Sequence, residues 1–425
     1  MDQRTRRPPR RGRPPVDSRP SPEPGAGLFA RLIGDGLSPD ETAEARAVEP
    51  LAHLEYRREL ALKNQALASF WVQHKLAGEP APVLPSPRPR HYRTTTRRRA
   101  RYHAGRLQLG FGDQREPTPA VPDSALEPDA HSTLYRYLAE ELSAPPHRPV
   151  AQHLNHAIIR GSYETYSVIL NLDELSAPIV RRLKVLAGRL QERPEPVISA
   201  FAFCDPSRSE YYFEREAPPV PVRLKKLFGP ARFPLPLAGR RYALPPTSFS
   251  QVNESMVEPM LAAVRQLLQP RAGDGLLDLY CGYGLFSHDL SDTCTEVVGL
   301  DVDRGSIQSA RDQLRFSHPA GRVTFSCGDI SPESLDRSLP QLPDHGRELV
   351  VLDPPRQGTA PGVVSHLAAR RPHAVVHVFC GIESIPAAAA EWKSGGYAIV
   401  SCTPLDMFPG TPNLETLILL HPRGR

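Results

Sequence analysis

The chain has 425 residues, more than a single hydrophobic core usually organises, so we expect two folded units and a tail. No apolar run reaches the roughly 20 residues that a membrane span requires, and the six cysteines are scattered without a CxxC pair. The sequence therefore argues against a membrane protein, a disulfide framework and a metal site, and it predicts a soluble cytoplasmic protein whose modest net charge of +5 is unevenly placed.

Two basic segments account for this uneven charge. The first lies among the prolines at the start of the chain, which prevent a helix, so residues 1–50 are predicted to be a disordered tail. The second is residues 88–106, in which arginines that include Arg97, Arg98 and Arg99 alternate with tyrosines and threonines. This pattern is typical of a β-hairpin facing phosphates, and a solvated arginine face explains it about as well.

The middle of the chain reads as a small α+β unit, predicted to span residues 51–245 and to bind the substrate. Apolar residues at helical spacing predict a long first helix, and alternating patterns predict two hairpins. The expected elements are a helix at 51–76, a hairpin at 92–111, a helix at 132–142, a hairpin at 155–172, a helix at 178–190 and a strand at 197–204.

From about residue 248 onward, strands alternate with helices, which indicates a parallel sheet covered on both faces. Strands are expected at 276–280, 296–300, 322–326, 349–352, 374–379, 398–402 and 414–420. No helix separates the last two strands, so the seventh should pair antiparallel. The fold class is therefore α/β, a Rossmann-like, doubly wound methyltransferase architecture over residues 246–425.

The first of these strands ends in Asp278-Leu-Tyr-Cys-Gly-Tyr-Gly284, a glycine turn that allows a ligand close to the backbone. A turn needed only for packing is the simpler alternative. Asp301, after the second strand, is placed to accept from ribose hydroxyls, and Asp329, after the third, is placed beside an adenine. Ser287 replaces the third glycine of a dinucleotide fingerprint, which argues against a nicotinamide cofactor.

Two further strands end in reactive side chains. The fourth ends in Asp353-Pro-Pro-Arg356, a rigid elbow at the edge where doubly wound folds bind ligands, although a simple turn has the same composition. The fifth ends at Cys380, which by itself reads equally as a small buried hydrophobic residue. Position alone does not decide between these interpretations.

Five motifs nevertheless fall in one order: Ser248-Phe-Ser-Gln-Val-Asn253, Asp278-Leu-Tyr-Cys-Gly282, Asp353-Pro-Pro-Arg356, Cys380 and Met407-Phe-Pro-Gly-Thr-Pro-Asn-Leu-Glu415. In this combination the chain resembles the RNA uracil-5 methyltransferases, specifically from residue 249 to 420 and weakly from residue 56.

The resemblance implies S-adenosylmethionine as methyl donor and carbon 5 of a uridine in RNA as acceptor. It implies that Cys380 is the nucleophile and Glu415 the base, and that Gln251, Asp353 and Arg356 hold the uracil or position the catalytic groups. The residues expected at the donor are Gln251, Asp278, Tyr280, Gly282, Gly284, Asp301, Asp329 and Asp353. The residues expected at the RNA are Gln251, Arg356, Arg97 and Arg99.

The chemistry of uracil agrees with these roles. Carbon 5 is a poor nucleophile until a thiolate adds to carbon 6, and after methylation its hydrogen must leave as a proton before the thiol is expelled. A simpler interpretation of Glu415 is a surface charge at the end of a strand.

The chain departs from the family pattern at two places, Gly381-Ile382 after Cys380 and Asn413 before Glu415. Two other functions therefore stay open: methylation of an exocyclic amine, which needs no cysteine, and RNA binding without catalysis. Residues 106–111 resemble the ribosomal members of this family more closely, which implies ribosomal RNA as substrate, with transfer RNA as the alternative. We further expect a monomer with no iron–sulfur cluster and no membrane partner.

Overall fold

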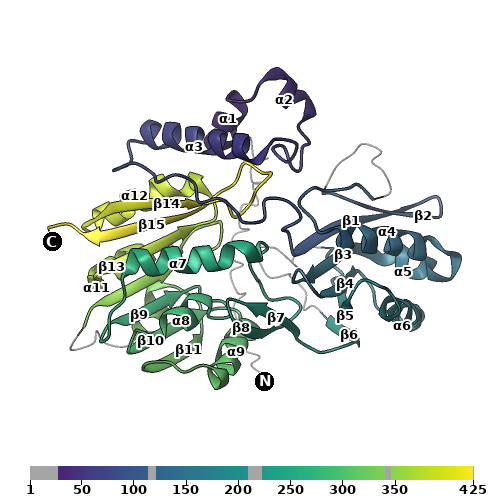
Figure 1. Cartoon of the computed structure of the whole chain (residues 1–425). Coiled ribbons are helices and arrows are strands. Elements are labelled where there is room, and N and C mark those ends of the chain that lie inside the picture. The colour runs from purple at the N-terminus through teal and green to yellow at the C-terminus, as the bar shows by residue number, and fades with distance from the viewer. Residues whose placement is uncertain (1–26, 113–120, 209–222, 340–345, 425) are drawn as a thin grey trace, which may run out of the picture.

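The computed structural model describes residues 27–112, 121–208, 223–339 and 346–424, and these residues build two sheets side by side (Figure 1). A two-stranded hairpin, β7 (Phe233–Leu237) with β8 (Arg240–Leu244), lies between the sheets in the chain. The predicted tail up to residue 26 lies outside the described residues.

The first sheet has the strand order β2-β1-β3-β4-β5-β6, and its only parallel pair among the described strands is β4 with β5. Helices α4 (Asp129–Ser143), α5 (Arg148–His153) and α6 (Ala177–Gln191) bury their apolar sides on one face. The strands are β1 Thr95–His103, β2 Arg106–Gly110, β3 Leu154–Gly161, β4 Tyr166–Leu172, β5 Val197–Cys204 and β6 Arg223–Phe228. Both predicted hairpins are confirmed.

The second sheet has the strand order β11-β10-β9-β12-β13-β15-β14, with β15 antiparallel to both of its neighbours. The other neighbouring strands pair in parallel. The strands are β9 Gly275–Leu279, β10 Glu296–Asp301, β11 Arg322–Cys327, β12 Glu348–Leu352, β13 Ala374–Phe379, β14 Tyr397–Leu405 and β15 Glu415–Pro422. All seven predicted strands and the antiparallel seventh strand are confirmed.

Helices cover both faces of the second sheet, which explains why its strands are almost continuously apolar. One face packs against α7, α8 and the β7–β8 hairpin, with α9 over the neighbouring strands β10 and β11. The other packs against α10, α11 and α12. These helices are α7 Val257–Leu268, α8 Leu285–Leu290, α9 Arg304–Gln313, α10 Pro332–Ser338, α11 Val363–Arg370 and α12 Ile385–Ser394.

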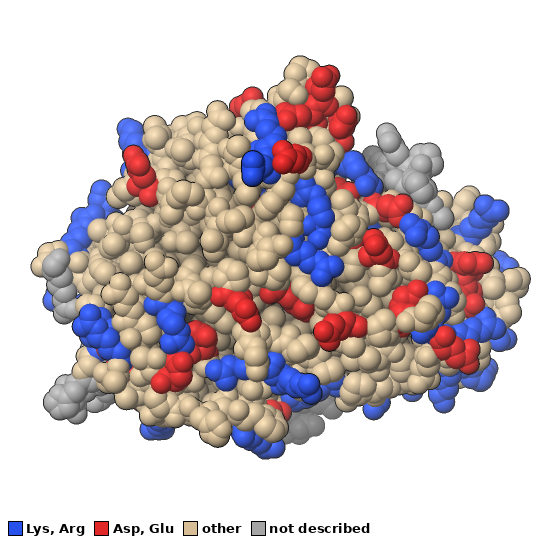
Figure 2. All heavy atoms as spheres, viewed as in Figure 1, with Lys and Arg blue, Asp and Glu red and all other residues tan. Residues whose placement is uncertain are grey.

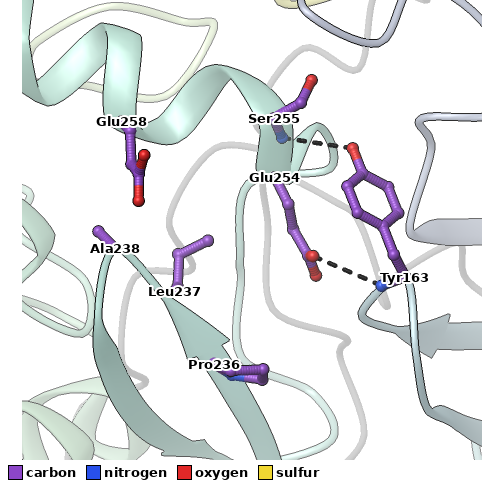
Figure 3. Close-up of a pocket in the computed structure, with 7 residues that line it drawn as sticks. All are labelled: Tyr163, Pro236, Leu237, Ala238, Glu254, Ser255 and Glu258. Atoms are coloured by element: carbon purple, nitrogen blue, oxygen red, sulfur yellow. Dashed lines mark hydrogen bonds between the residues drawn. The ribbon is translucent and has the colours of Figure 1, made fainter.

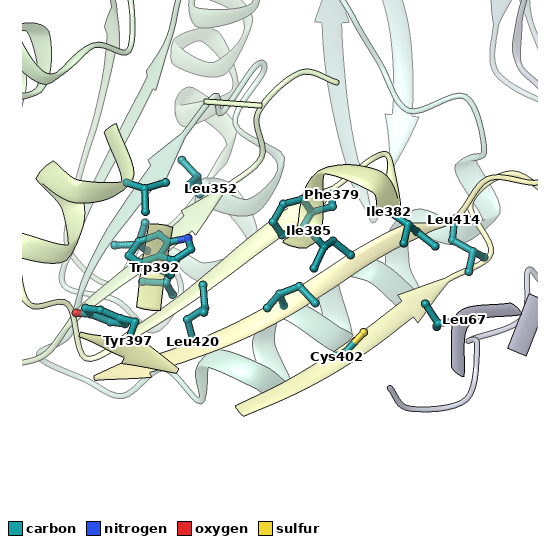
Figure 4. Packing of buried hydrophobic residues seen from close by; sticks show 14 of the residues in the cluster. Leu67, Leu352, Phe379, Ile382, Ile385, Trp392, Tyr397, Cys402, Leu414 and Leu420 are labelled. Carbon is teal, nitrogen blue, oxygen red and sulfur yellow. The ribbon is translucent and has the colours of Figure 1, made fainter. Parts of the chain in front are cut away.

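The N-terminal helices correct two sequence predictions. Residues 27–50 are not all disordered, because α1 (Leu28–Asp35) buries Phe29 and Ile33, and α2 (Pro39–Glu44) begins with a capping box. The predicted long helix forms as α3 (Tyr56–Gln73), yet it packs on the second sheet and not on the first. Leu67 of α3 belongs to the same apolar cluster as Cys402 of β14 (Figure 4).

The segment that follows α3 runs along the edge strand β14. Pro80 and Leu84 form parallel bridges with Cys402 and Leu405 before the chain crosses to the first sheet. These bridges partly cover the outer edge of β14, which is the last strand of its sheet. The boundaries of the predicted division into residues 1–50, 51–245 and 246–425 stay a prediction. Helices α1 and α3, which lie in the first two of these ranges, pack in the apolar core of the second sheet.

We expect Ile33→Ala to lower the free energy of unfolding by about 2–4 kcal/mol, because Ile33 is 2% exposed and packs in the core of the second sheet. Urea denaturation measures the change. Val72→Ala is the control, since Val72 is 77% exposed and its truncation should change stability by less than about 0.5 kcal/mol. Equal stabilities of the two variants would show that α1 is not docked in solution.

Candidate functional site

The pairing of β13 with β15 brings two predicted catalytic residues to one end of the sheet. Phe379 pairs with Thr416, so the next residues on the two antiparallel strands are Cys380 and Glu415. Glu415 also pairs with Leu405 of β14, which encloses it between two strands. The thiol and the carboxylate therefore meet at the carboxyl edge of the parallel strands, the edge where doubly wound folds bind ligands.

Asp353 and Arg356 join this pair from the end of β12. Arg356 is exposed, and its positive charge lies close enough to Cys380 to lower the pKa of the thiol. The backbone N–H of Asp353 donates to the carbonyl of Leu279 at 3.2 Å, which anchors the elbow to the neighbouring strand β9. The structure thus unites four predicted residues from three strand ends.

The four groups perturb one another electrostatically. Burial raises the pKa of Glu415 to about 7, against the opposing effect of Arg356. Burial and the Glu415 carboxylate raise the pKa of Asp353 well above its usual range. Burial, Glu415 and Asp353 raise the pKa of the Cys380 thiol to about 11, while Arg356 lowers it. Such opposed perturbations in one crevice are typical of catalytic sites.

These pKa shifts describe the resting protein. Near neutral pH Cys380 is a protonated thiol, and Glu415 stands close to half ionisation. Attack by Cys380 requires loss of its proton, and Arg356 is the described cation beside it that stabilises the thiolate. A carboxylate with a pKa near the working pH is well suited to accept a proton from carbon.

The glycine turn after β9 adopts the conformation that its sequence requires. Gly282 and Gly284 have φ angles of +53° and +80°, a region that glycine enters freely. A Cβ on Gly284 would approach Phe325 to 2.8 Å, so this position also excludes side chains by packing. The N–H of Gly282 donates to Asp301 at 2.8 Å, which ties the turn to the end of β10.

Asp301 and Asp278 retain acceptor capacity toward a ligand. Asp301 accepts one backbone N–H on each oxygen, from Gly282 and Asp303, and each oxygen has a second lone pair. Asp278 accepts from the N–H and hydroxyl of Ser287 through Oδ2. Its Oδ1 is buried and has no hydrogen-bond partner among the described residues. A buried acceptor without a partner fits the ammonium group of S-adenosylmethionine.

The remaining residues predicted for the donor lie around this turn. Tyr280 has a φ angle of +62° and is half-buried against the core that contains α11. Asp329 follows β11 and is exposed, and its Oδ1 accepts from Ser334 at 2.8 Å. A hydrogen bond from Ser334 lowers the pKa of Asp329, so it is available as an anionic acceptor. Gln251 is 9% exposed in the 248–253 segment.

Asn253, for which no role was predicted, lies at a junction between two segments near the site. Its Nδ2 donates to the Met407 carbonyl and to the Ser86 hydroxyl, each at 3.1 Å. It is fully buried, so it ties the Gln251 segment to the loop that precedes Glu415. The signal available in the sequence was its place at the end of the motif Ser248–Asn253.

The arginines of β1 divide between the two faces of the first sheet. Arg97 and Arg99 are half-buried and belong to a different sheet from Cys380. Arg98 was predicted among the phosphate-facing residues, and this is wrong: it is 1% exposed and bonds both oxygens of Glu127 at 2.6 and 2.7 Å. Alternation along a strand explains the difference. Figure 2 shows basic side chains interspersed with acidic ones on the viewed face.

A cavity of about 240 Å³ lies between the β3–β4 turn, the β7–β8 hairpin and the start of α7 (Figure 3). Tyr163 and Glu254 lie side by side in its lining, where the backbone N–H of Tyr163 donates to Oε2 of Glu254 at 3.4 Å, and burial raises the pKa of Glu254 to about 7. None of the residues predicted for catalysis or donor binding lines this cavity, so we do not assign it to the reaction.

No group of three or more His, Cys, Asp or Glu side chains within the described ranges is arranged to hold a metal ion. Among the helices that the structure describes, none is long and apolar enough to cross a membrane.

Comparison with known sequences gives matches to RNA methyltransferases. Residues 232–326 match the family described as tRNA (Uracil-5-)-methyltransferase. An uncharacterized RNA methyltransferase of Enterococcus faecalis is 25% identical over 90% of this chain and 82% of its own length. The 23S rRNA (uracil(1939)-C(5))-methyltransferase RlmD of an Enterobacter species is 33% identical over 43% of this chain. That match spans 41% of the length of the Enterobacter protein.

Comparison with solved structures shows the same fold. The tRNA (uracil-54, C5)-methyltransferase of Pyrococcus abyssi, solved in complex with S-adenosyl-L-homocysteine, superposes with a TM-score of 0.65. The superposition covers 89% of this chain and 86% of the archaeal protein, at 21% sequence identity. The predicted methyltransferase fold is therefore confirmed.

The raised pKa of Glu415 predicts a pH dependence of stability. Its folded-state pKa of about 7 exceeds the ordinary value of 4.5, so the native state holds the proton more tightly between these pH values. Stability should therefore fall as pH rises through this window, by up to about 3 kcal/mol. Glu415→Gln should make the fall of stability with pH shallower by that amount, measured by urea denaturation between pH 4.5 and 8.

The exposed Glu79 supplies the control for this measurement, because Glu79→Gln should leave the wild-type slope intact. If Glu415→Gln loses stability with pH as steeply as the wild type does, the carboxylate is not in the buried environment described above.

Proposed function

We propose that this chain, a relative of the RNA uracil-5 methyltransferases in sequence and in fold, methylates carbon 5 of a uridine in RNA with S-adenosylmethionine as donor. The comparisons confirm the predicted family resemblance, and they agree with the predictions of an enzyme and of this donor. The single observation that carries the reaction type is Cys380 next to Glu415 at the ends of β13 and β15.

Cys380 begins the proposed reaction. The thiol of Cys380 releases its proton to water. The thiolate then adds to carbon 6 of the uracil, which forms a sulfur–carbon bond and moves the electron pair of the C5–C6 double bond into an enolate. Arg356 stabilises the thiolate and, as the ring accepts charge, the oxygen that becomes negative. S-adenosylmethionine supplies an electrophilic methyl group, and carbon 5 takes this group when its electron pair is available.

Glu415 completes the reaction. Its carboxylate removes the proton from carbon 5, the C5–C6 double bond re-forms, and the thiolate of Cys380 leaves with the electron pair of the sulfur–carbon bond. The pKa of Glu415, near 7, supports this role, since the ionised form is available at neutral pH and its protonated form can release the proton to water. Burial and the Glu415 carboxylate raise the pKa of Asp353, whose carboxyl group is proposed to bond the uracil.

The donor is proposed to lie over the glycine turn. Gly282 and Gly284 let its amino-acid portion approach the backbone, Asp278 receives its ammonium group, and Asp301 accepts from the ribose hydroxyls. Asp329 is proposed to accept from the adenine amino group, and Tyr280, Gln251 and Asp353 are proposed as further contacts of the donor.

Ribosomal RNA is the favoured substrate, because the Enterobacter relative is named for 23S rRNA. Transfer RNA stays the alternative, supported by the family match and by the archaeal neighbour. Arg97 and Arg99 are proposed to contact phosphates. A cytoplasmic monomer without an iron–sulfur cluster stays a prediction.

The two other functions fit the site less well. Methylation of an exocyclic amine uses no thiol, so it does not explain why Cys380 and Glu415 lie next to each other. RNA binding without catalysis leaves unexplained why two carboxyl groups with raised pKa values are kept together beside Arg356.

Asp301→Ala should weaken binding of S-adenosylmethionine by about 10- to 100-fold, because charge-assisted hydrogen bonds to the ribose are lost. Isothermal calorimetry measures the dissociation constant. Asp312→Ala is the control, as Asp312 forms a partly exposed ion pair with Arg232 and should leave donor affinity unchanged. If Asp301→Ala binds the donor as tightly as the wild type does, the proposed contact between Asp301 and the ribose is wrong.

Cys380→Ala should abolish methylation while donor binding remains. RNA with 5-fluorouridine at the target should trap wild-type protein, since fluorine on carbon 5 cannot leave as a proton and the thiol cannot be expelled. Glu415→Gln should stay covalently bound to ordinary RNA, because the proton on carbon 5 is not removed and the thiol is again not expelled. A denaturing gel detects each covalent complex.

Cys402→Ala is the matched control, because Cys402 is buried in mid-strand and should be dispensable for adduct formation. If Cys380→Ala still methylates uridine, or still forms the fluorinated adduct, Cys380 is not the nucleophile.

A further inference from the structure

The loop that precedes Glu415, residues 406–414, is held by side chains that lie more than 300 positions earlier in the chain. It connects β14 to β15, and its position therefore sets where the first residue of β15 begins. The contacts that hold it come mainly from α3 and from the segment after α3 (Figure 1).

Three charged side chains form the centre of this attachment. The Nζ atom of Lys63 lies 2.7 Å from Oε1 of Glu59 and 2.7 Å from Oδ1 of Asp406. All three side chains have no exposed surface. Arg90 adds a second cation, 3.1 Å from Oε2 of Glu59, so two carboxylates face two cations. We call Glu59, Lys63, Arg90 and Asp406 the buried ion cluster.

The buried ion cluster also binds the backbone of the loop. The N–H of Gly410 donates to Oε1 of Glu59 at 2.6 Å, and the carbonyl of Phe408 accepts from Lys63 at 3.4 Å. Tyr56 donates its hydroxyl to Asp406 at 3.0 Å. A Cβ on Gly410 would lie 2.5 Å from Leu126, so the loop is also enclosed sterically.

Glu59 and Lys63 stand four residues apart on the side of α3 that faces the protein core. Charged groups in such a place are costly unless each is paired, and a helix that needed only to cover the sheet would be served by apolar residues. The arrangement does what apolar residues cannot: it fixes the loop in one register through directed bonds to Asp406 and Gly410.

We propose that Glu59 and Lys63 are positioning residues for the catalytic base, acting through Asp406 and Gly410 to hold Glu415 against Cys380. This inference rests on the proposed function. It predicts a specific defect: when the cluster is broken, Cys380 still attacks and the methyl group is still transferred, but removal of the proton by Glu415 is slow.

The test is Lys63→Met in the full chain, which keeps the length of the side chain and removes its charge. Turnover of methylated RNA should fall by roughly 100-fold, as expected for a base displaced by about 1 Å. The variant should accumulate the covalent complex on ordinary RNA, as Glu415→Gln does, whereas donor affinity and the rate of adduct formation on 5-fluorouridine RNA should equal those of the wild type. A general loss of structure would lower all of these together.

Arg370→Met is the matched control, because it removes a partner of the buried Glu348 at the opposite end of the same sheet. It should not accumulate the complex. If Lys63→Met does not fold, Glu59→Gln removes one charge at nearly constant shape and should give the same excess of covalent complex.

The outcomes separate the two proposals. A wild-type protein that forms no adduct with 5-fluorouridine RNA would overturn the proposed function and this inference with it. If the wild type and Glu415→Gln behave as proposed, but the cluster variants release RNA at the wild-type rate or lose adduct formation on the fluorinated RNA, the positioning role alone is wrong.

Discussion

The pairing of β15 between β13 and β14 is the constraint on which the site depends. An antiparallel strand at this place begins where the neighbouring parallel strand ends, so the first residue of β15 lies opposite the residue that follows β13. Glu415 and Cys380 are adjacent for that reason. The same geometry buries a carboxylate beside Asp353, and Arg356 lowers the pKa of Glu415 against the effect of burial.

The N-terminal helices belong to this catalytic half. Helix α1 docks on the turn directly after Cys380, where the N–H of Phe29 donates to the Glu383 side chain at 2.8 Å. Ile382 fills the core beneath the turn, and Gly381 has extended backbone. The departure from the family pattern after Cys380 thus lies at the turn that α1 contacts.

The first sheet contains several arginines whose side chains are buried or half-buried. Its helices bury one face completely, and β1 alternates between the buried Arg98 and the half-buried Arg97 and Arg99. Arg160 of β3 is 2% exposed and donates to Pro246 and Ser250 of the connecting segment. Arginines in this sheet thus serve its attachment to the catalytic half as well as any polyanion.

Local patterns determined the secondary structure, the doubly wound class and the glycine turn at Gly282, because hydrophobic periodicity and left-handed glycines act over a few residues. The order of the motifs also placed Cys380 and Glu415 at strand ends. The roles of Lys63 and Arg98 depended on tertiary structure, since a charged residue in a helix or strand reads as solvent-facing until its buried partner is known. Those partners, Asp406 and Glu127, are distant in sequence or hidden in a loop, and only the packing of α3 and β1 brings them within bonding distance.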